Sequence, residues 1–377
     1  MKEEMAETRI FKIYKNRRVL VTGHTGFKGS WLSVWLRELG ANVIGYALDP
    51  PTNPSNFSAC KLHTLVTHYH GDVRDLGHLL EVFAKHKPEI VFHLAAQPLV
   101  RLSYHEPKNT FDTNVGGTVN VLEAVRLNPF VKVSVIVTSD KCYENREWVW
   151  GYRENDPLGS DDPYSASKAC AELVFSAYRK SFFDGKTATR KLGVASVRAG
   201  NVIGGGDWAD HRLIPDCVRA LVKNEPVGIR SPRASRPWQH VLEPLGGYLL
   251  LGALLWENPE TYGGSWNFGP SEASHRHVGE IVSRFIRLWG SGEWRDLSDA
   301  DNRLHEATTL RLCCDKADTY LKWQPVLTLD DCLRMTARWY KTYYAGGQGE
   351  RGMYPLCRGQ IRSYMRGAKK SNVLWLE

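Results

Sequence analysis

The stretch RVLVTGHTGFKG, residues 18–29, decides the fold of this chain. Its opening residues are mostly apolar and predict a buried strand over Arg18–Thr22. Gly23, Gly26 and Gly29 follow, and an apolar helical pattern begins behind them. Glycines in such a turn allow a close approach of the backbone, and N–H groups at a helix start bind pyrophosphate. The stretch therefore predicts a dinucleotide-binding unit.

The glycine spacing is G-x-x-G-x-x-G rather than G-x-G-x-x-G. A lone glycine motif is a weak signal, so a plain structural turn is the alternative. The next expected strand, 42–48, ends at Asp49, twenty residues beyond Gly29. A carboxylate there suits the adenosine ribose hydroxyls and disfavours a 2′-phosphate, so we expect NAD rather than NADP. A helix cap or turn residue before Pro50 is the alternative for Asp49.

Strand and helix patterns continue to alternate along the first half. Residues 71–75, GDVRD, follow a short strand pattern, and Asp72 is placed to meet the adenine amino group. A strand over 89–94 runs into Ala95, Ala96 and Gln97, where small residues let a cofactor lie against the backbone. A helix over 109–126, which contains Asn114, and a strand over 131–137 follow. The alternation predicts an α/β fold, a Rossmann-type doubly wound parallel sheet with a smaller mixed α/β substrate-binding domain.

Reactive side chains collect in the middle of the chain. Ser139, Asp140 and Lys141 follow the strand over 131–137, and ligands in open α/β sheets bind at the carboxyl ends of strands. In DDPYSASK, residues 161–168, Tyr164 and Lys168 share one face of a predicted helix. The ammonium is expected to lower the pKa of the phenol toward working pH, which makes a general base for alcohol oxidation. The alternative for Tyr164 and Lys168 is a chance pair on an ordinary amphipathic helix. The alternative for Asp140 and Lys141 is a surface ion pair or a helix cap.

Longer strings resemble the extended short-chain dehydrogenase/reductase family of nucleotide-sugar epimerases and dehydratases. The shared elements are TGHTGFKG, GDVRD, HLAAQP, TSDKCY and YSASK. Within this family, the sequence is most similar to the branch that dehydrates CDP-linked glucose. The strings similar to that branch are AAQPLVRLSY, TSDKCYENREWVWGYREN, RAGNVIGGGDW, RPWQHVLEPLGGYLLL and WNFGP. The resemblance spans about residues 15–345.

This resemblance implies roles for individual residues. Ser139 and Tyr164 would contact the sugar 4-hydroxyl, and Lys168 would hold the nicotinamide ribose. Related dTDP-glucose dehydratases carry Asp-Glu where this chain has Asp140 and Lys141. We further assign to the cofactor Thr25, Phe27, Lys28, Val73, Leu94 and Thr138, and to the substrate Arg101, Asn201, Arg212, Arg230, Arg236, Trp238 and Gln239. Each arginine is alternatively a surface charge, Trp238 a core residue, and the glycines at 204–206 turn residues.

The implied reaction begins when Tyr164 takes the 4-hydroxyl proton while NAD accepts the 4-hydride. The resulting ketone acidifies the proton on carbon 5, which Lys141 removes. Protonated Asp140 assists departure of the 6-hydroxyl as water, and the hydride returns to carbon 6. The product is a 4-keto-6-deoxy sugar. The division of acid and base roles between Asp140 and Lys141 stays open, because a lysine base needs a depressed pKa.

Composition limits the class of protein. The chain has 377 residues, 42% hydrophobic and 24% charged, with a net charge of +8. The basic residues are scattered, so an anionic small substrate explains them as well as nucleic acid does. Eight cysteines form no C-x-x-C pair, which argues against zinc or disulfides and favours a reducing compartment. A polar N-terminus and short apolar runs predict neither a secretory signal nor a membrane span. We expect a cytoplasmic protein without metal.

We expect a loose leader over 1–17 and an NAD-binding domain over 18–200, to which parts of 235–270 return. A mainly substrate-binding domain over 201–345 and a loosely held, basic, Gly-rich tail over 346–377 complete the chain. The family commonly pairs through a four-helix bundle, which implies a homodimer or homotetramer. The rival functions are a 4-epimerase or simple dehydrogenase, a non-catalytic NAD-binding scaffold, and a nucleic-acid binder.

Overall fold

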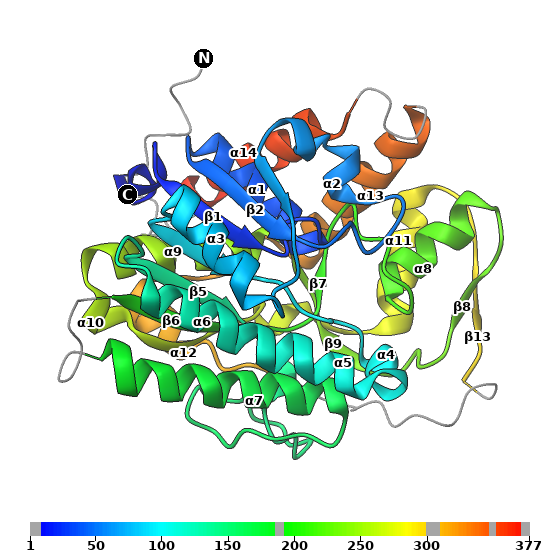
Figure 1. The fold of residues 1–377 in the computed structure, drawn as a ribbon. Coiled ribbons are helices and arrows are strands. Elements are labelled where there is room, and N and C mark those ends of the chain that lie inside the picture. Colours follow the sequence, from blue (N-terminus) through cyan, green and yellow to red (C-terminus); the bar gives the residue numbers. More distant parts are fainter. Residues whose placement is uncertain (1–8, 185–191, 299–309, 347–351, 371–377) are drawn as a thin grey trace.

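A parallel sheet forms the centre of the molecule. The computed structural model describes residues 9–184, 192–298, 310–346 and 352–370. Within these ranges seven strands pair in the order β11-β6-β5-β4-β1-β2-β3, all in parallel (Figure 1). Their bounds are β1 (Arg18–Thr22), β2 (Asn42–Ala47), β3 (Thr67–His70), β4 (Ile90–His93), β5 (Val133–Val137), β6 (Gly193–Ala199) and β11 (Gly264–Phe268). The doubly wound parallel sheet predicted from the sequence is confirmed.

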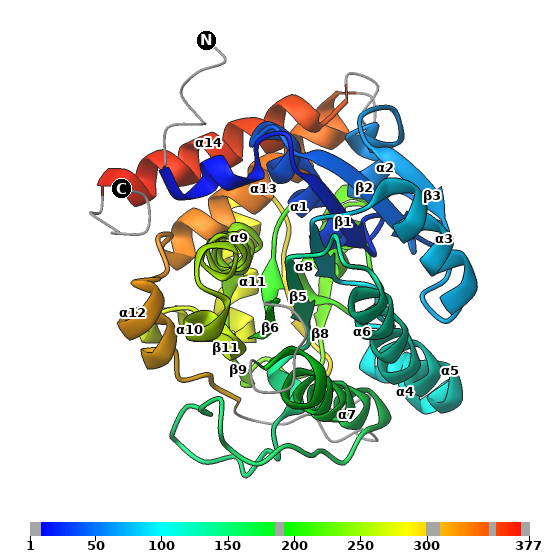
Figure 2. The same cartoon turned by 60° about the vertical axis from the view of Figure 1, so that its left-hand side comes forward.

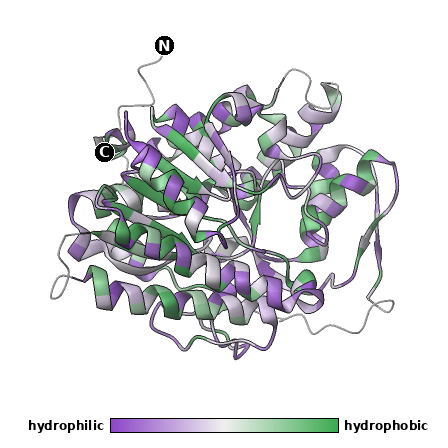
Figure 3. Ribbon diagram, in the orientation of Figure 1, coloured by the Kyte–Doolittle hydropathy of each residue, from purple (hydrophilic) through white to green (hydrophobic). Residues whose placement is uncertain are grey.

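Helices cover both faces of this sheet (Figure 2). Side chains alternate along β1, so Val19 and Val21 join one buried cluster while Leu20 joins the other. The first face carries η1 (Arg9–Tyr14), α1 (Phe27–Glu38), α9 (Leu242–Glu257), α13 (Leu329–Ala345) and α14 (Tyr354–Lys370). The second carries α3 (Leu76–His86), α6 (Gly117–Leu127) and α7 (Pro163–Tyr178). Because both faces are covered at the centre of the sheet, the central strands β1, β4 and β5 are largely apolar and buried (Figure 3), whereas the edge strand β3 is polar and mostly exposed.

Beyond β6, short two-stranded pairings build the smaller mixed α/β part. These pair β7 (Val202–Ile203) with β10 (Gln239–His240), β8 (Val227–Ile229) with β13 (Trp294–Asp296), and β9 (Ser235–Pro237) with β12 (His275–His277). The helices α8 (Leu213–Val222) and α11 (Val278–Trp289) pack beside them. The remaining helices are α2 (Asn56–Ala59), α4 (Val100–His105), α5 (Pro107–Phe111), α10 (Pro259–Tyr262) and α12 (Asp315–Leu321). The domain boundaries drawn from the sequence stay a prediction.

The interpretation of residues 346–377 as a loosely held tail is wrong for the part that the structure describes. Helix α14 packs on α1 and buries Cys357, Ile361 and Tyr364. The Tyr364 hydroxyl donates a hydrogen bond to Oε2 of Glu243, at 2.9 Å. Glu243 is itself buried on α9, and its Oε1 accepts the backbone N–H groups of residues 326 and 327. The C-terminal helix is thus part of the core.

The leader prediction is also wrong over residues 9–17. Phe11 and Tyr14 are fully buried under α9, and the Tyr14 hydroxyl donates to the Leu249 carbonyl at 2.6 Å. Residues 1–8 lie outside the described ranges. The prediction was based on the polar composition of this stretch. Its few apolar side chains nevertheless contact the distant helix α9 and hold the stretch in the core. No helix in the described parts of the chain is long and apolar enough to cross a bilayer.

Replacing Tyr364 with phenylalanine is expected to lower the free energy of unfolding by about 1–3 kcal/mol. The buried Glu243 carboxylate would lose a hydrogen-bond donor without access to water. Urea denaturation followed by circular dichroism measures the change. Tyr320→Phe is the matched control, because Tyr320 is 63% exposed. Equal stability of both variants would show that α14 is not anchored through this contact.

Candidate active site

The glycine turn after β1 has the shape of a pyrophosphate cradle. Gly23 has a φ of 73°, and a Cβ there would lie 2.6 Å from the Ala95 nitrogen. A Cβ on Gly29 would overlap sterically with the Gly23 carbonyl group. Helix α1 begins after Gly26 with no side-chain cap, so its first N–H groups are left for a ligand anion. The turn alternative does not explain this uncapped start, and the residues fit a dinucleotide.

We expect Gly29→Ala to weaken NAD binding by tenfold or more, an effect of about 1.4 kcal/mol at least. The added methyl group would push the Gly23 carbonyl out of the turn. Titration of NAD by protein fluorescence measures the affinity, and circular dichroism checks the fold. Gly359→Ala is the control, since a Cβ there meets nothing within 4 Å. Unchanged affinity in Gly29→Ala would contradict the cradle.

The expected adenosine contacts lie at the ends of β2 and β3. Thr25 donates to the Leu48 carbonyl at 3.0 Å, which ties the glycine turn to the end of β2. The Asp49 carboxylate is 87% exposed and lies 3.7 Å from Nε2 of His70. Asp72 is held by Arg74, whose hydrogen bonds lower the pKa of the carboxyl. The ribose and adenine roles of Asp49 and Asp72 stay predictions.

The segment after β4 is fixed by the hydroxyl of Thr22 and by the side-chain amide of Asn114. The Thr22 hydroxyl accepts the N–H groups of Leu94 and Ala95 at 3.2 and 3.3 Å. Asn114 accepts the Gln97 N–H at 2.8 Å and donates to Ser167 on α7 at 2.9 Å. Asn114 therefore joins the predicted cofactor floor, which also contains Ala96, to the helix that carries Tyr164. Val73 is a core residue packed against α6.

Four predicted catalytic groups meet where β5 ends. Ser139 caps the short helix η4 (Asp140–Cys142), and its hydroxyl donates to Asp140 at 3.0 Å. Helix α7 starts behind its cap, Asp162, and the Tyr164 N–H donates to Ser103 of α4 at 3.1 Å. Tyr164, Lys168, Ser139 and Asp140 are all buried. The structure therefore brings these residues together, with Lys141 half-buried beside them.

The electrostatics of the pair on α7 differ from the sequence expectation. Burial raises the pKa of Tyr164 to about 12, partly offset by the Ser139 hydroxyl and, more weakly, by Arg212. Burial also lowers the pKa of Lys168 to about 8, against opposing effects of Cys142 and Glu172. The pKa of Tyr164 thus lies above its ordinary value in this structure, and the predicted support of the phenolate by Lys168 stays a prediction. Loss of water penalises both charged forms, and this outweighs their proximity in the helix.

Asp140 has the environment of a proton donor. Burial raises the pKa of this carboxyl, although Lys141, Ser139 and Lys28 lower it. Gly200 leaves room for it, because a Cβ there would lie 2.8 Å from Oδ2 of Asp140. A raised pKa favours the protonated carboxylic acid, the form that can protonate a leaving hydroxyl.

Two further cations belong to this cluster. Burial, Arg212 and Lys168 lower the pKa of Lys28 to about 8, while Asp140 opposes them. Arg212 is held by Asp207 at 2.9 Å, and its charge acts on Tyr164. Of the arginines assigned to the substrate, Arg212 lies close enough to the site for its charge to lower the pKa of Tyr164. Lys28, at the start of α1, joins the glycine turn to the catalytic cluster.

The other substrate candidates are more dispersed. Asn201 accepts the Gln239 N–H through its carbonyl, and Gln239 Oε1 is buried with no partner among the described residues. Trp238 lies in the core with its N–H on the Arg276 carbonyl, so the structure favours the core alternative. Arg101 lies on α4, Arg230 follows β8 and Arg236 lies on β9; all three are half-buried, and their substrate roles stay predictions. The glycines at 204–206 pack closely against Phe27, Trp339 and Asn56, as structural residues do.

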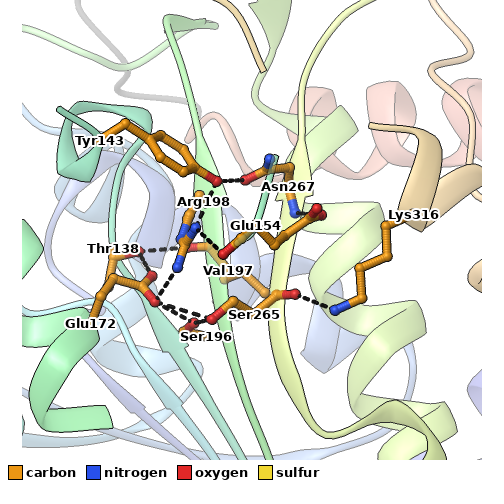
Figure 4. Close-up of polar contacts among 10 residues, drawn as sticks. All are labelled: Thr138, Tyr143, Glu154, Glu172, Ser196, Val197, Arg198, Ser265, Asn267 and Lys316. Atoms are coloured by element: carbon orange, nitrogen blue, oxygen red, sulfur yellow. Dashed lines mark hydrogen bonds and ion pairs between the residues drawn. The ribbon is translucent and has the colours of Figure 1, made fainter. Parts of the chain in front are cut away.

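Sequence reasoning missed a buried polar network behind the catalytic segment (Figure 4). Glu172 and Arg198 form its centre and are 1% and 2% exposed. Thr138, predicted as a cofactor residue, donates to Glu172 at 2.5 Å. The available signal was the spacing of Tyr164, Lys168 and Glu172, which repeats every four residues along one helical face.

Comparisons with known proteins agree with this site. Residues 19–253 match the model of the NAD dependent epimerase/dehydratase family. The chain is 52% identical to a CDP-glucose 4,6-dehydratase of Salmonella typhimurium, over 88% of this chain and 93% of that protein. An epimerase of Methanothermobacter thermautotrophicus has the same fold, with a TM-score of 0.75, 22% identity, and coverage of 91% and 97%. So does a dTDP-glucose 4,6-dehydratase of Bacillus anthracis solved with NAD, with a TM-score of 0.71, 23% identity, and coverage of 87% and 98%.

The family match covers more than half of the chain, and the Salmonella relative extends it to most of the remainder. The glycine cradle after β1 and the Tyr164–Lys168 helix at the end of β5 are the parts that a dinucleotide-dependent sugar enzyme needs. NAD is therefore the cofactor, and the enzyme-class expectation is confirmed at the level of the family. From its sequence, its fold and its site, the chain belongs to the NAD-dependent epimerase/dehydratase family.

Proposed function

We propose that this protein is a CDP-glucose 4,6-dehydratase, which converts CDP-glucose into CDP-4-keto-6-deoxyglucose and water. The observation that carries the proposal is the joint placement of Tyr164, Ser139 and Asp140 with Lys141. A 4-epimerase or dehydrogenase needs the first two but has no use for an acid and a base beside them. The 52% identity to the Salmonella dehydratase supports the same reaction and the same nucleotide.

Each step uses a group of the chain. Tyr164, as phenolate, takes the proton of the 4-hydroxyl, and Ser139 orients that hydroxyl. NAD held at the glycine turn after β1 would supply the hydride chemistry, that is, hydride acceptance from carbon 4 and hydride donation to carbon 6. Lys141 removes the proton of carbon 5, which the 4-ketone has acidified. Asp140 gives its proton to the departing 6-hydroxyl, which leaves as water, and a proton returns to carbon 5.

The raised pKa of Asp140 favours its role as an acid, whereas the raised pKa of Tyr164 opposes its role as a base. Burial raises the pKa of Asp140, which favours the role of proton donor. Tyr164 needs a phenolate, and the cationic neighbours Lys28, Lys168 and Arg212 provide the positive field in which it forms. The same cations are placed to hold anionic phosphates when cofactor and substrate are bound. Arg230 and Arg236 are further proposed contacts of the diphosphate.

The remaining proposals concern the setting of the enzyme. We place it in the cytoplasm, where nucleotide sugars are made and thiols stay reduced. A homodimer or homotetramer is proposed on the basis of the family resemblance. Neither nucleic acid nor membrane is a proposed partner. Sedimentation of the purified chain tests the assembly state.

A substrate screen tests the reaction. The NAD-loaded protein is incubated with CDP-, dTDP-, GDP- and UDP-glucose, and products are analysed by mass. Loss of one water from CDP-glucose alone is expected. An isomer of unchanged mass would identify an epimerase, dehydration of another nucleotide sugar would correct the base, and no turnover with NAD bound would favour the non-catalytic scaffold.

A further inference from the structure

A buried ion pair between Glu172 and Arg198 lies next to Thr138 and Tyr143, the two ends of the catalytic segment 138–143 (Figure 4). Glu172 follows Tyr164 and Lys168 along α7, so the three side chains share one stripe of the helix. Arg198 lies on β6, and its Nη2 donates to Oε2 of Glu172 at 2.7 Å. Both side chains are almost fully removed from water. The pair therefore links the catalytic helix to the sheet.

Glu172 also binds the beginning of the catalytic segment. Its Oε1 accepts the hydroxyl of Thr138, which directly precedes Ser139, at 2.5 Å. Its Oε2 accepts the hydroxyls of Ser196 on β6 at 2.8 Å and Ser265 on β11 at 3.2 Å. One carboxylate thus fixes α7 against three adjacent strands.

Arg198 binds the other end of the same segment. Its Nη1 donates to the hydroxyl of Tyr143 at 2.6 Å and to the Glu154 carbonyl at 3.1 Å. The Tyr143 hydroxyl in turn donates to Asn267 of β11 at 2.8 Å. Residues 138–143 are therefore held at both ends by the two halves of one ion pair, and Ser139, Asp140 and Lys141 lie between the ends.

Stability alone does not account for this arrangement. Taking two charges out of water costs several kcal/mol per ion, so a buried pair is often replaceable by apolar residues without loss of stability. Arg198 Nε is buried with no partner among the described residues, so the guanidinium is not fully compensated. A specific task in the site is the better explanation.

We propose that Glu172 and Arg198 are positioning residues of the reaction: together they hold the catalytic segment 138–143 against α7, and Glu172 supplies the negative charge that faces Lys168. This inference rests on the proposed function for the identity of the reaction. It assigns no contact with substrate to either residue. Its consequence is that removing the Glu172 charge changes the ionisation of Lys168 as well as the packing.

The direction of that change follows from the groups around Lys168. They are Tyr164 and Glu172 on its own helix, Cys142 of η4, His93 of β4 and Lys28 of α1. Burial lowers the pKa of Lys168 to about 8, and Cys142 and Glu172 oppose that effect. Cys142 carries no charge near neutral pH, because burial raises the pKa of its thiol. Without Glu172, Lys168 loses its proton at lower pH and no longer supports the phenolate.

The experiment measures single-turnover reduction of bound NAD by CDP-glucose as a function of pH. We expect Glu172→Gln to slow this step by about tenfold or more and to move its alkaline limb down by about half a pH unit or more. The double variant Glu172→Gln/Arg198→Gln removes both charges, so it should recover most of the thermal stability and keep the shifted limb. Glu243→Gln, a buried carboxylate on α9 outside the site, should lower stability without moving the limb.

Two outcomes would overturn the proposal. If Glu172→Gln or the double variant keeps the wild-type alkaline limb, the pair acts on stability alone. If neither variant folds, the pair is a structural requirement and the assigned role is wrong. Failure of the proposed function looks different, because the wild type would then not reduce its bound NAD with CDP-glucose. In that case the same variants are assayed with the nucleotide hexose that the wild type does accept.

Discussion

Tyr164→Phe is expected to abolish turnover at the first chemical step. Phenylalanine keeps the ring in its buried place beside Ser139 but cannot accept the 4-hydroxyl proton. Loss of a general base costs about 10²–10⁴-fold. Single-turnover reduction of bound NAD by CDP-glucose should slow by that factor, while the affinities for NAD and CDP-glucose change little because the ring still fills its site.

Tyr178→Phe is the matched control for this prediction. Tyr178 lies on the same helix, but its hydroxyl donates a hydrogen bond to Glu123, at 3.3 Å. Glu123 is only partly buried and is not one of the predicted catalytic residues. This variant should keep the wild-type rate within about threefold. A Tyr164→Phe enzyme that reduced NAD as fast as the control would remove the phenol from the mechanism and leave Lys168 or Asp140 as the base.

The parallel sheet could be predicted because its central strands β1, β4 and β5 are largely apolar runs and because strand and helix patterns alternate along the first half of the chain. The C-terminal helix α14 could not be recognised from composition, since glycines and basic residues dominate residues 346–377. Its buried side chains nevertheless recur with helical spacing: Cys357, Ile361, Tyr364, Met365 and Ala368. Periodicity was the better signal than composition there. The leader was misjudged for the same reason, because the short apolar pattern of Ile10, Phe11, Ile13 and Tyr14 was outweighed by the polar composition of residues 1–17.

The catalytic cluster could be predicted as a set of strand ends and one helical face, which local rules place at the same edge of the sheet. Its electrostatics could not. The pKa of Tyr164 depends on how completely water is excluded and on Arg212, which lies 48 residues away in the sequence. The ion pair of Glu172 with Arg198 also depends on the pairing of β5 with β6. That pairing could not be predicted from a single sequence.

Lys141→Met is expected to separate the two halves of the reaction. The variant should still oxidise carbon 4, because Tyr164, Lys168 and Ser139 are unchanged. It should not remove the proton of carbon 5, so elimination of water slows by about 10²–10⁴-fold. Reduced cofactor would then accumulate on the enzyme, and in D₂O the sugar would gain no deuterium at carbon 5. Absorbance of the bound cofactor and mass of the recovered sugar measure the two halves separately.

The environment of Asp140 makes this variant informative. The Lys141 ammonium lowers the pKa of Asp140 against the stronger effect of burial. Without the lysine this lowering effect on the pKa of Asp140 is lost, which favours its role as proton donor, so the missing function is the base. Lys108→Met, which removes an 87% exposed lysine, should dehydrate CDP-glucose normally. If Lys141→Met also dehydrates normally, Asp140 or another group removes the carbon 5 proton, and the roles of the two neighbours must be reversed.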